Sequence, residues 1–500
     1  MFMWFAFAGL PITLMVRHLS GSFLRQELSR LLGKIRLLPL WLVILIGATA
    51  ILIGLMAVVT PPMNFDVQIY HLPREIFWMM QGSVTPFSAT HTHQISMPVL
   101  AEYLGLNLLL LSGTDALHNL IQTIFMASAC GLISLIVSDL GGCARAQGLA
   151  VLTMLLTPAA FFEASNSKND IILSLFVLFP LATGLRLWLH RSEPTFPILF
   201  AASLSAGLSL ATKGTAVVYL FPSAILIVAA CLRQHSGRTL LMAIVPGLLL
   251  VLLPPLPQMM RNQALFHSAA GPNLHHANLH HDPGAILNVI IRNIAGQFTG
   301  NSAPWNRYLE SSTRSLLESL SLNPDDPSTT FEGQTFHLPY FAGLEDIVPA
   351  PVQTMLLLLC PLSLFFSPLR RRPGRIALFA CSYGALLLFC LLFRWQPWQS
   401  RLLIPGYFMA APLIGIMLDQ LRPTWLVLVM TFAELLSLRP HLIYAGQRPL
   451  LGNNSIFRMS RDEQMSRMMP GRAIELRTLI SILSKSPPSA IQIDGGATEI

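Results

Sequence analysis

Charged residues are scarce in this chain of 500 residues, which excludes an ordinary soluble protein. Only 11% of the residues are charged, whereas soluble globular proteins carry about 25%. Hydrophobic residues make up 53% of the chain and the mean hydropathy is +0.58, which also excludes a disordered chain. The length alone would suggest about three soluble domains, but the composition predicts a polytopic integral membrane protein.

Several other features are absent or rare. The six cysteines have no metal-site spacing and lie in or beside apolar segments, so no disulfide framework is expected. The apolar stretch 2–16 has no basic segment before it and no small-residue cleavage site after it, which favours a retained helix over a signal peptide. The net charge of +8 comes from basic residues at helix ends, so nucleic acid is not an expected partner.

Apolar segments long enough, or nearly so, to cross a bilayer of ~30 Å recur along the chain and predict about 11–13 transmembrane helices. We expect a transmembrane domain over 1–437 and an outer-face tail over 438–500 that contains a helix and a short strand (490–493). No internal repeat is visible, which argues against an inverted-repeat transporter. The expected spans are 2–16, 38–59, 117–137, 146–162, 169–189, 196–211, 214–232, 239–256, 351–367, 375–393, 402–419 and 423–437.

Lysine and arginine are concentrated in alternate connections, which predicts the orientation of the helices. The basic set is cytoplasmic, so the loops of about 60–116 and 257–350 lie on the outer face. The first loop contains two stretches, 73–83 and 98–113, with the periodicity of helices that lie along a membrane surface. The second loop is rich in Asn, His, Pro and Gly, which is typical of an ordered cap or a partly mobile lid.

Ionisable residues at the ends of the expected spans collect on the outer side. Placing an ionisable side chain in or beside a membrane span costs free energy, so such residues are candidates for a functional site. Cations at the interface can hold a lipid-linked phosphate, and a carboxylate can take a proton from an attacking hydroxyl. The alternative is that the cations only extend to the lipid headgroups. The residues are Asp66, Glu163, Lys168, Asp170, Lys213, Arg394 and Arg401.

Asp66 is the sharpest candidate for a catalytic base. It directly follows an expected span, and His71 and Arg74 crowd the start of the next helix, where Pro73 suits the first turn. The alternative is that Asp66 caps a helix or lies at headgroup level. Asp170 starts another span and has the same alternative role as an N-terminal cap.

Histidines offer a weaker signal. His91 and His93 stand two residues apart and could ligate a divalent metal, although such a pair alone is weak evidence. The histidine-rich run 275–282, which ends at Asp282, could also bind metal, but a polar loop is the more common meaning of such a run. A divalent metal therefore stays open, and no other cofactor is indicated.

Short motifs in a fixed order resemble the bacterial GT-C superfamily of membrane glycosyltransferases, which includes relatives of protein O-mannosyltransferases and aminoarabinose transferases. They span most of the chain, and their order and membrane placement carry the resemblance more than any single motif. The motifs are DVQIYHLPREIFW (66–78), AEY (101–103), NLIQ (119–122), EASNSKND (163–170), ATKGTA (211–216), RWQPWQSRLLIP (394–405) and RPLLGNNSIF (448–457).

The resemblance implies an inverting enzyme of the bacterial inner membrane whose active site faces the periplasm or exterior. It implies that a sugar passes from a polyprenyl-phosphate donor to a hydroxyl of a glycan, lipid or protein acceptor. Asp66 corresponds to the family's catalytic base. Some members have an acidic pair at this point, but Val67 follows Asp66 here, so a second carboxylate would have to come from Asp170 or Glu102. The alternatives are a flippase or transporter of a lipid-linked glycan, or an O-antigen ligase or polymerase.

These arguments assign roles to further residues. Lys213, Arg394 and Arg401 are expected to hold the donor phosphate while Asp66 accepts the proton. Trp395 and Trp398 could stack on a sugar ring, although anchoring at headgroup depth is the more common role of such tryptophans. The residues expected to contact substrate are Tyr70, His71, Arg74, Gln94, Glu102, Asn169, Asp170, Trp395 and Trp398.

Overall fold

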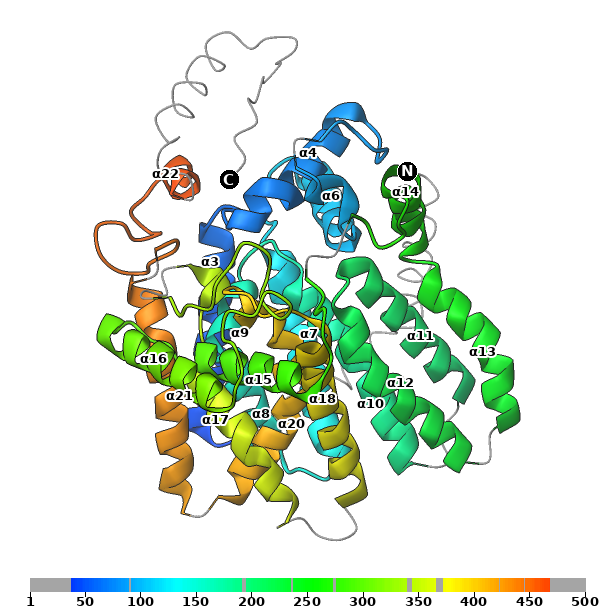
Figure 1. The fold of residues 1–500 in the computed structure, drawn as a ribbon, viewed down its shortest axis with the longest axis vertical. Coiled ribbons are helices and arrows are strands. Elements are labelled where there is room, and N and C mark those ends of the chain that lie inside the picture. Colours follow the sequence, from blue (N-terminus) through cyan, green and yellow to red (C-terminus); the bar gives the residue numbers. More distant parts are fainter. Residues whose placement is uncertain are drawn as a thin grey trace.

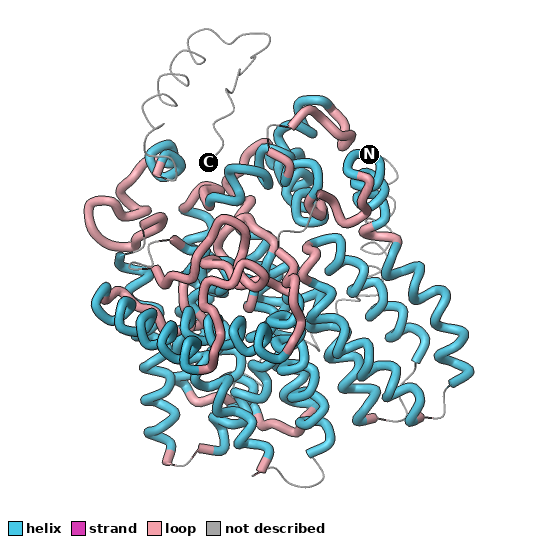
Figure 2. Tube along the Cα trace, in the orientation of Figure 1, coloured by secondary structure: helices cyan, strands magenta, loops and turns pink. Residues whose placement is uncertain are grey.

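The computed structural model describes residues 37–89, 91–190, 195–234, 237–272, 276–339, 344–365, 372–421, 423–444 and 446–467. The expected helix over 2–16, and the expected helix and strand at the end of the tail, lie outside these ranges. Within the described ranges the chain is helical and contains no strand, only two isolated β-bridges (Figure 2). The expectation of an all-α membrane protein is confirmed.

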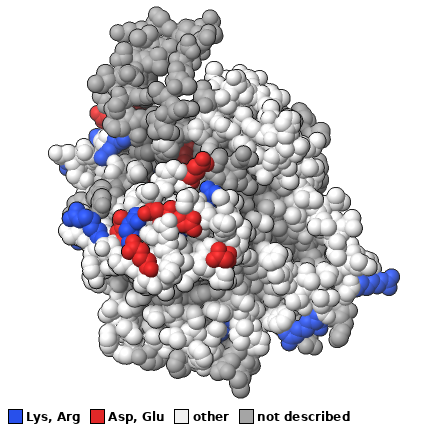
Figure 3. Space-filling model, in the orientation of Figure 1, with Lys and Arg blue, Asp and Glu red and all other residues white. Residues whose placement is uncertain are grey.

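Seven described helical segments are long and apolar enough to cross a membrane, and an eighth is the bent pair α13 (Gly237–Leu252) and α14 (Leu256–Phe266), with a 58° angle at the break. They make the chain a multi-pass membrane protein, and most of the face in Figure 3 carries no charged side chain, as contact with lipid requires. The seven are α3 (Leu40–Val59), α7 (Leu120–Asp139), α10 (Asp170–Leu189), α12 (Ala216–Arg233), the segment Glu345–Leu364 with α17 (Pro351–Leu359) and η3 (Cys360–Leu364), α18 (Arg372–Leu392) and α21 (Thr424–Tyr444).

Three shorter helices also form where spans were expected: α8 (Ala144–Leu155), α11 (Thr195–Thr212) and α20 (Ile404–Gln420). α20 is the centre of the bundle, because every side chain from Ile404 to Leu418 is buried. Gly415 lets α20 approach α8 closely, since a Cβ at this position would lie 2.6 Å from the carbonyl oxygen of Ala146.

The segment expected as one span over 146–162 is broken. α8 ends at Leu155, and a separate short helix, α9 (Pro158–Glu163), begins after Thr157. Proline has no N–H to donate to the preceding turn, so it starts a helix more readily than it continues one. The break places the polar turn 164–169, whose residues are all buried, at the mouth of the bundle.

Both long loops lie at one end of the bundle, which we call the loop end: α3 and α13 finish there, and α7 and α17 begin there (Figure 1). The first loop forms η1 (Val67–His71), α4 (Leu72–Gln81), α5 (His93–Ser96) and α6 (Leu100–Ser112), so helices form in both stretches that were expected to be helical. The second loop contains α14, α15 (Pro283–Gln297) and α16 (Ala303–Ser319), which the composition did not indicate.

Hydrogen bonds join the two loops to each other. Gln258 of α14 donates to the carbonyl oxygen of Ile95 at 2.6 Å, and Asn262 donates to that of Ser96 at 2.9 Å. Both side chains are buried, where each hydrogen bond also avoids the cost of an unpaired polar group. The loops therefore form a joint cap over the loop end.

Candidate active site

Asp66, Asp346 and Arg401 meet at the loop end although they are far apart in the sequence. Arg401 lies in the short helix α19 (Gln399–Leu402), just before α20 begins, and Asp346 lies in the 3-10 turn η2 (Glu345–Ile347), just before α17. One guanidinium nitrogen, Nη1 of Arg401, donates to Oδ2 of Asp66 and to Oδ1 of Asp346, the latter at 3.2 Å. One cation is thus shared by two carboxylates.

Lys168 adds a second cation to the same place. Its Nζ donates to Asp346 and, at 3.3 Å, to Oε1 of Glu163. Glu163 is the last residue of α9 and Lys168 lies in the turn that follows, and Asn166 of this turn donates to the other oxygen of Glu163 at 3.1 Å. The break at Pro158 therefore brings this turn to the end of the bundle where the other charged residues lie.

A further ion pair completes the group. Lys213, at the end of α11, donates to Oδ1 of Asp170 at 2.5 Å, and Asn169 donates to the carbonyl oxygen of Thr212 at 3.1 Å. The N-terminal cap position of α10 is Asn169 rather than Asp170, and Asp66, at the cap position of η1, makes no cap hydrogen bond, so neither aspartate shows the alternative role of a helix cap. The charged cluster consists of Asp66, Glu163, Lys168, Asp170, Lys213, Asp346 and Arg401.

Exposure divides the charged cluster into a front and a back. The side chains of Asp66, Asp346, Arg401 and Lys213 are 12–18% exposed. Those of Lys168, Glu163 and Asp170 are at most 1% exposed. Side chains that reach for lipid headgroups would be exposed at their charged tips, so this alternative does not describe Lys168 or Arg401. The front residues are the ones that a bound molecule could touch.

The environment sets the protonation of the carboxyl groups in different directions. Burial raises the pKa of Asp66, but the charges of Arg401, Lys168 and His71 outweigh it and hold the pKa below its ordinary range. Burial raises the pKa of Glu163 above its ordinary value, against the opposing charge of Lys168. Asp66 is therefore ionised at neutral pH, whereas Glu163 holds its proton more strongly than an ordinary glutamate does.

A second polar network lies inside the first loop. Arg74 is fully buried and donates to Oε1 of Glu102 at 2.8 Å and to the carbonyl oxygens of Gln94 and His93 at 2.6 and 2.5 Å. His71 Nδ1 lies 3.0 Å from the same oxygen of Glu102. Arg74, Gln94 and Glu102, expected as substrate contacts, are thus engaged with the loop itself. The carboxylate that shares a cation with Asp66 is Asp346, whereas Glu102 pairs with Arg74 and His71, and Asp170 pairs with Lys213.

Tyr70 connects this network to the charged cluster. Its hydroxyl donates to Oδ2 of Asp66 at 3.5 Å, and its ring lies 4.0 Å from that of His71, centroid to centroid. Both residues belong to the π-helix η1, a widened helical turn that is frequent at functional sites. The extra residue in this turn was not predicted from the sequence.

The histidines do not form a metal cage in the described part of the chain. The Nδ1 atoms of His91 and His93 lie 3.2 Å apart, but no group of three or more His, Cys, Asp or Glu side chains is placed to hold an ion among the residues described. Burial and the neighbouring His91 lower the pKa of His93 to about 4, so its ring is neutral at pH 7. In the run 275–282, Asp282 caps α15 by accepting from the backbone of Gly284 and Ala285.

The tryptophans and Arg394 lie beside the charged cluster, on the side of the second loop. Trp395 is buried against Phe336, with centroids 5.0 Å apart, so it is neither an exposed platform nor a headgroup anchor. Trp398 is half-buried and packs its edge on Phe331. Among the described residues Arg394 forms no ion pair, and its Nε has no hydrogen-bond partner. Among the described residues, Lys213 and Arg401 thus pair with carboxylates of the charged cluster, and Arg394 does not.

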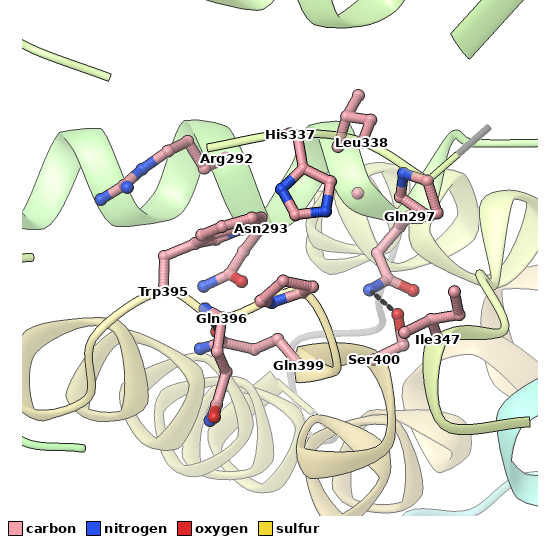
Figure 4. Close-up of a pocket in the computed structure, with 13 residues that line it drawn as sticks. Arg292, Asn293, Gln297, His337, Leu338, Ile347, Trp395, Gln396, Gln399 and Ser400 are labelled. Carbon is pink, nitrogen blue, oxygen red and sulfur yellow. Dashed lines mark hydrogen bonds between the residues drawn. The ribbon is translucent and has the colours of Figure 1, made fainter. Parts of the chain in front are cut away.

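A cavity of about 20 Å³ lies behind α19, between α15 and the turn that contains Ile347 (Figure 4). Gln297 of α15 donates to the hydroxyl of Ser400 at 3.0 Å and accepts from the backbone of Ala350 at 3.1 Å. Ser400 precedes Arg401, and Ala350 precedes α17. Gln297 thus fixes the two backbone segments that carry Arg401 and Asp346. The cavity has room for about one water molecule.

Arg448 and Glu345 hold the same turn from the other side. Arg448, which is fully buried, donates to both oxygens of Glu345 at 2.6 and 2.8 Å and to the carbonyl oxygens of Phe162 and Ser165 at 3.0 and 2.5 Å. It therefore joins η2 to the turn after α9. Arg448 begins one of the motifs quoted above, but neither its role nor Glu345 and Asp346 were predicted, because no local pattern distinguishes them.

Removal of Arg448 is expected to destabilise the protein. In Arg448→Ala, Glu345 would stay buried without its partner, which costs about 3–5 kcal/mol. We expect a clearly lower midpoint of thermal unfolding in detergent. The matched control is Arg458→Ala, since Arg458 is exposed and should leave the midpoint within about 1 °C. Equal midpoints for the two variants would show that Arg448 does not hold this turn.

Comparison with known proteins agrees with this architecture. No family model and no curated protein matches the chain. The crystal structure of ArnT from Cupriavidus metallidurans bound to undecaprenyl phosphate superposes with a TM-score of 0.50 at 14% identity, over 88% of this chain and 72% of that chain. At this identity the likeness shows that the chain shares the fold of that protein. The structure of the same protein in the apo state gives a TM-score of 0.49 at 14% identity, over 88% and 70% of the two chains.

Proposed function

We propose that this chain is a membrane glycosyltransferase. It would transfer a sugar from a polyprenyl-phosphate donor to an acceptor hydroxyl, with inversion, at the outer face of a bacterial inner membrane. The observation that carries the proposal is the shared ion pair of Asp66 and Asp346 with Arg401 at the loop end. A fold like that of a protein bound to undecaprenyl phosphate supports the choice of donor.

The front cations would hold the donor phosphate. Arg401 and Lys213 are both partly exposed, and guanidinium and ammonium groups make strong, charge-assisted hydrogen bonds to phosphate oxygens. Lys168 lies behind them and strengthens the local positive potential. As the bond between the anomeric carbon and the phosphate oxygen breaks, negative charge builds up on that oxygen, and these cations stabilise it. Lipids would surround the spans, so the donor's polyprenyl chain can stay in the membrane.

Asp66 would be the general base. The acceptor oxygen forms the new bond to the anomeric carbon on the face opposite the phosphate, and its proton passes to Oδ2 or Oδ1 of Asp66. The ion pair with Arg401 keeps Asp66 deprotonated and thus ready to accept. When the donor phosphate binds Arg401, the interaction between Arg401 and Asp66 becomes weaker. Asp66 then loses part of this stabilisation and becomes a stronger base. Binding of the donor would thereby prepare the proton transfer.

The decisive experiment uses purified protein and a defined polyprenyl-phosphate monosaccharide. Release of free polyprenyl phosphate, and transfer of the sugar to an added envelope glycan or lipid, is the expected result. A flippase would leave the donor chemically unchanged, and an O-antigen ligase or polymerase would use whole glycans instead. Mass spectrometry of envelope glycans from cells with and without the gene would then identify the sugar and the acceptor.

A further inference from the structure

Asp346 lies between Arg401 and Lys168, two cations of the charged cluster. Its Oδ1 accepts from Arg401 at 3.2 Å and also from Lys168. Cationic donors that bind a carboxylate make the same kind of charge-assisted hydrogen bond to a phosphate oxygen. The Asp346 side chain is 14% exposed, so it lies on the front of the charged cluster, where an entering molecule would meet it.

The cluster has no surplus of positive charge. Four acidic side chains, those of Asp66, Glu163, Asp170 and Asp346, lie against three basic ones, those of Lys168, Lys213 and Arg401. A phosphate that enters adds negative charge to a site whose side chains have little contact with solvent. Like charges close together at low dielectric repel strongly, so one carboxylate has to give way before the phosphate can share its cations.

Geometry decides which carboxylate gives way. Asp66 is held from two sides, by Arg401 and by the hydroxyl of Tyr70, and the proposed reaction needs it in place. Among the bonds of the described residues, Asp346 accepts hydrogen bonds only from Arg401, which the phosphate would use, and from Lys168, which lies behind it. Its backbone is fixed independently, because the neighbouring Glu345 is bound by Arg448. Its side chain can therefore rotate away while η2 stays in place.

We propose that Asp346 is an internal competitor of the donor phosphate: its carboxylate binds Arg401 and Lys168, and the donor must displace it. This inference rests on the proposed function and adds a positioning residue to the site. The two aspartates are therefore expected to have opposite effects when their charge is removed. Two acidic residues share one arginine, yet loss of Asp66 would abolish turnover, whereas loss of the charge of Asp346 would tighten the binding of the lipid phosphate.

Binding of undecaprenyl phosphate to the full-length protein in detergent tests the inference. For Asp346→Asn we expect a Kd at least about tenfold lower than that of the unmodified protein, because the competing charge is gone. Asp346→Glu keeps the charge and should not tighten binding. Glu318→Gln on the exposed face of α16 is the matched control for a loss of one negative charge, and its Kd should be unchanged. Asp346→Ser takes the place of the asparagine variant if that variant does not fold.

The outcomes separate this inference from the proposed function. If the unmodified protein binds undecaprenyl phosphate and the folded Asp346→Asn variant binds it equally or more weakly, Asp346 is not a competitor, and the proposed function stands. If the glutamate variant binds as tightly as the asparagine variant, the effect is one of shape and the inference is again wrong. If the unmodified protein and all variants fail to bind, the choice of donor is wrong and the inference falls with it.

Discussion

Asp66→Asn is expected to lower kcat for sugar transfer by about 1000-fold or more, while the protein still folds and inserts. General base catalysis contributes about 10²–10⁴ to a rate, and asparagine cannot accept the proton. Asparagine has nearly the same size and can still accept a hydrogen bond from Arg401 through its amide oxygen. The variant should therefore keep its unfolding midpoint close to that of the unmodified protein, so that the loss reflects chemistry rather than stability.

The measurement is the rate of release of polyprenyl phosphate from a defined donor at saturating concentration. Asp462→Asn removes one charge from an exposed position of α22 (Arg461–Ser466) and serves as the control, with unchanged kcat expected. Asp66→Glu should retain partial activity, because the carboxylate remains but its position shifts. Turnover of Asp66→Asn at the level of the control would remove Asp66 from the role of base.

The arrangement of the bundle could be predicted from the sequence because the signals are local. Apolar segments mark spans, and the expected positions agree with α7, α10, α12 and α18. The placement of ionisable residues at span ends also predicted which of them share one side of the membrane. Asp66 and Arg401, 335 positions apart, are two of these residues, and the fold brings them into contact.

The finer geometry could not be predicted, because it depends on contacts between distant segments. The sequence places Asp346 in a loop with no distinctive pattern, and only the fold brings it to Lys168, 178 positions away. Arg394 and Arg401 flank the same turn and look equivalent in the sequence. They differ because the chain reverses between them, so that Arg394 follows α18 and Arg401 precedes α20. Two cations of one motif thus have different neighbours.

Arg401→Gln therefore provides the second large expected effect, with Arg394→Gln as its matched partner from the same turn. Loss of a partly buried, charge-assisted hydrogen bond to the donor phosphate costs about 2–4 kcal/mol, which corresponds to a rise of about 30- to 1000-fold in the Kd for undecaprenyl phosphate. Arg401→Lys should recover part of the affinity, because it restores the charge without the planar geometry of the guanidinium.

The paired variants test the geometry as well as the role. Arg394→Gln should change the Kd by less than about threefold, since Arg394 forms no ion pair with the charged cluster in the described structure. Equal losses in the two variants would mean that both cations reach the donor, as the sequence alone predicts, and that the donor extends further toward α18 than the structure suggests. Unchanged binding in Arg401→Gln would instead show that Arg401 serves only to pair Asp66 and Asp346, and the phosphate would have to be held by Lys213 and Lys168.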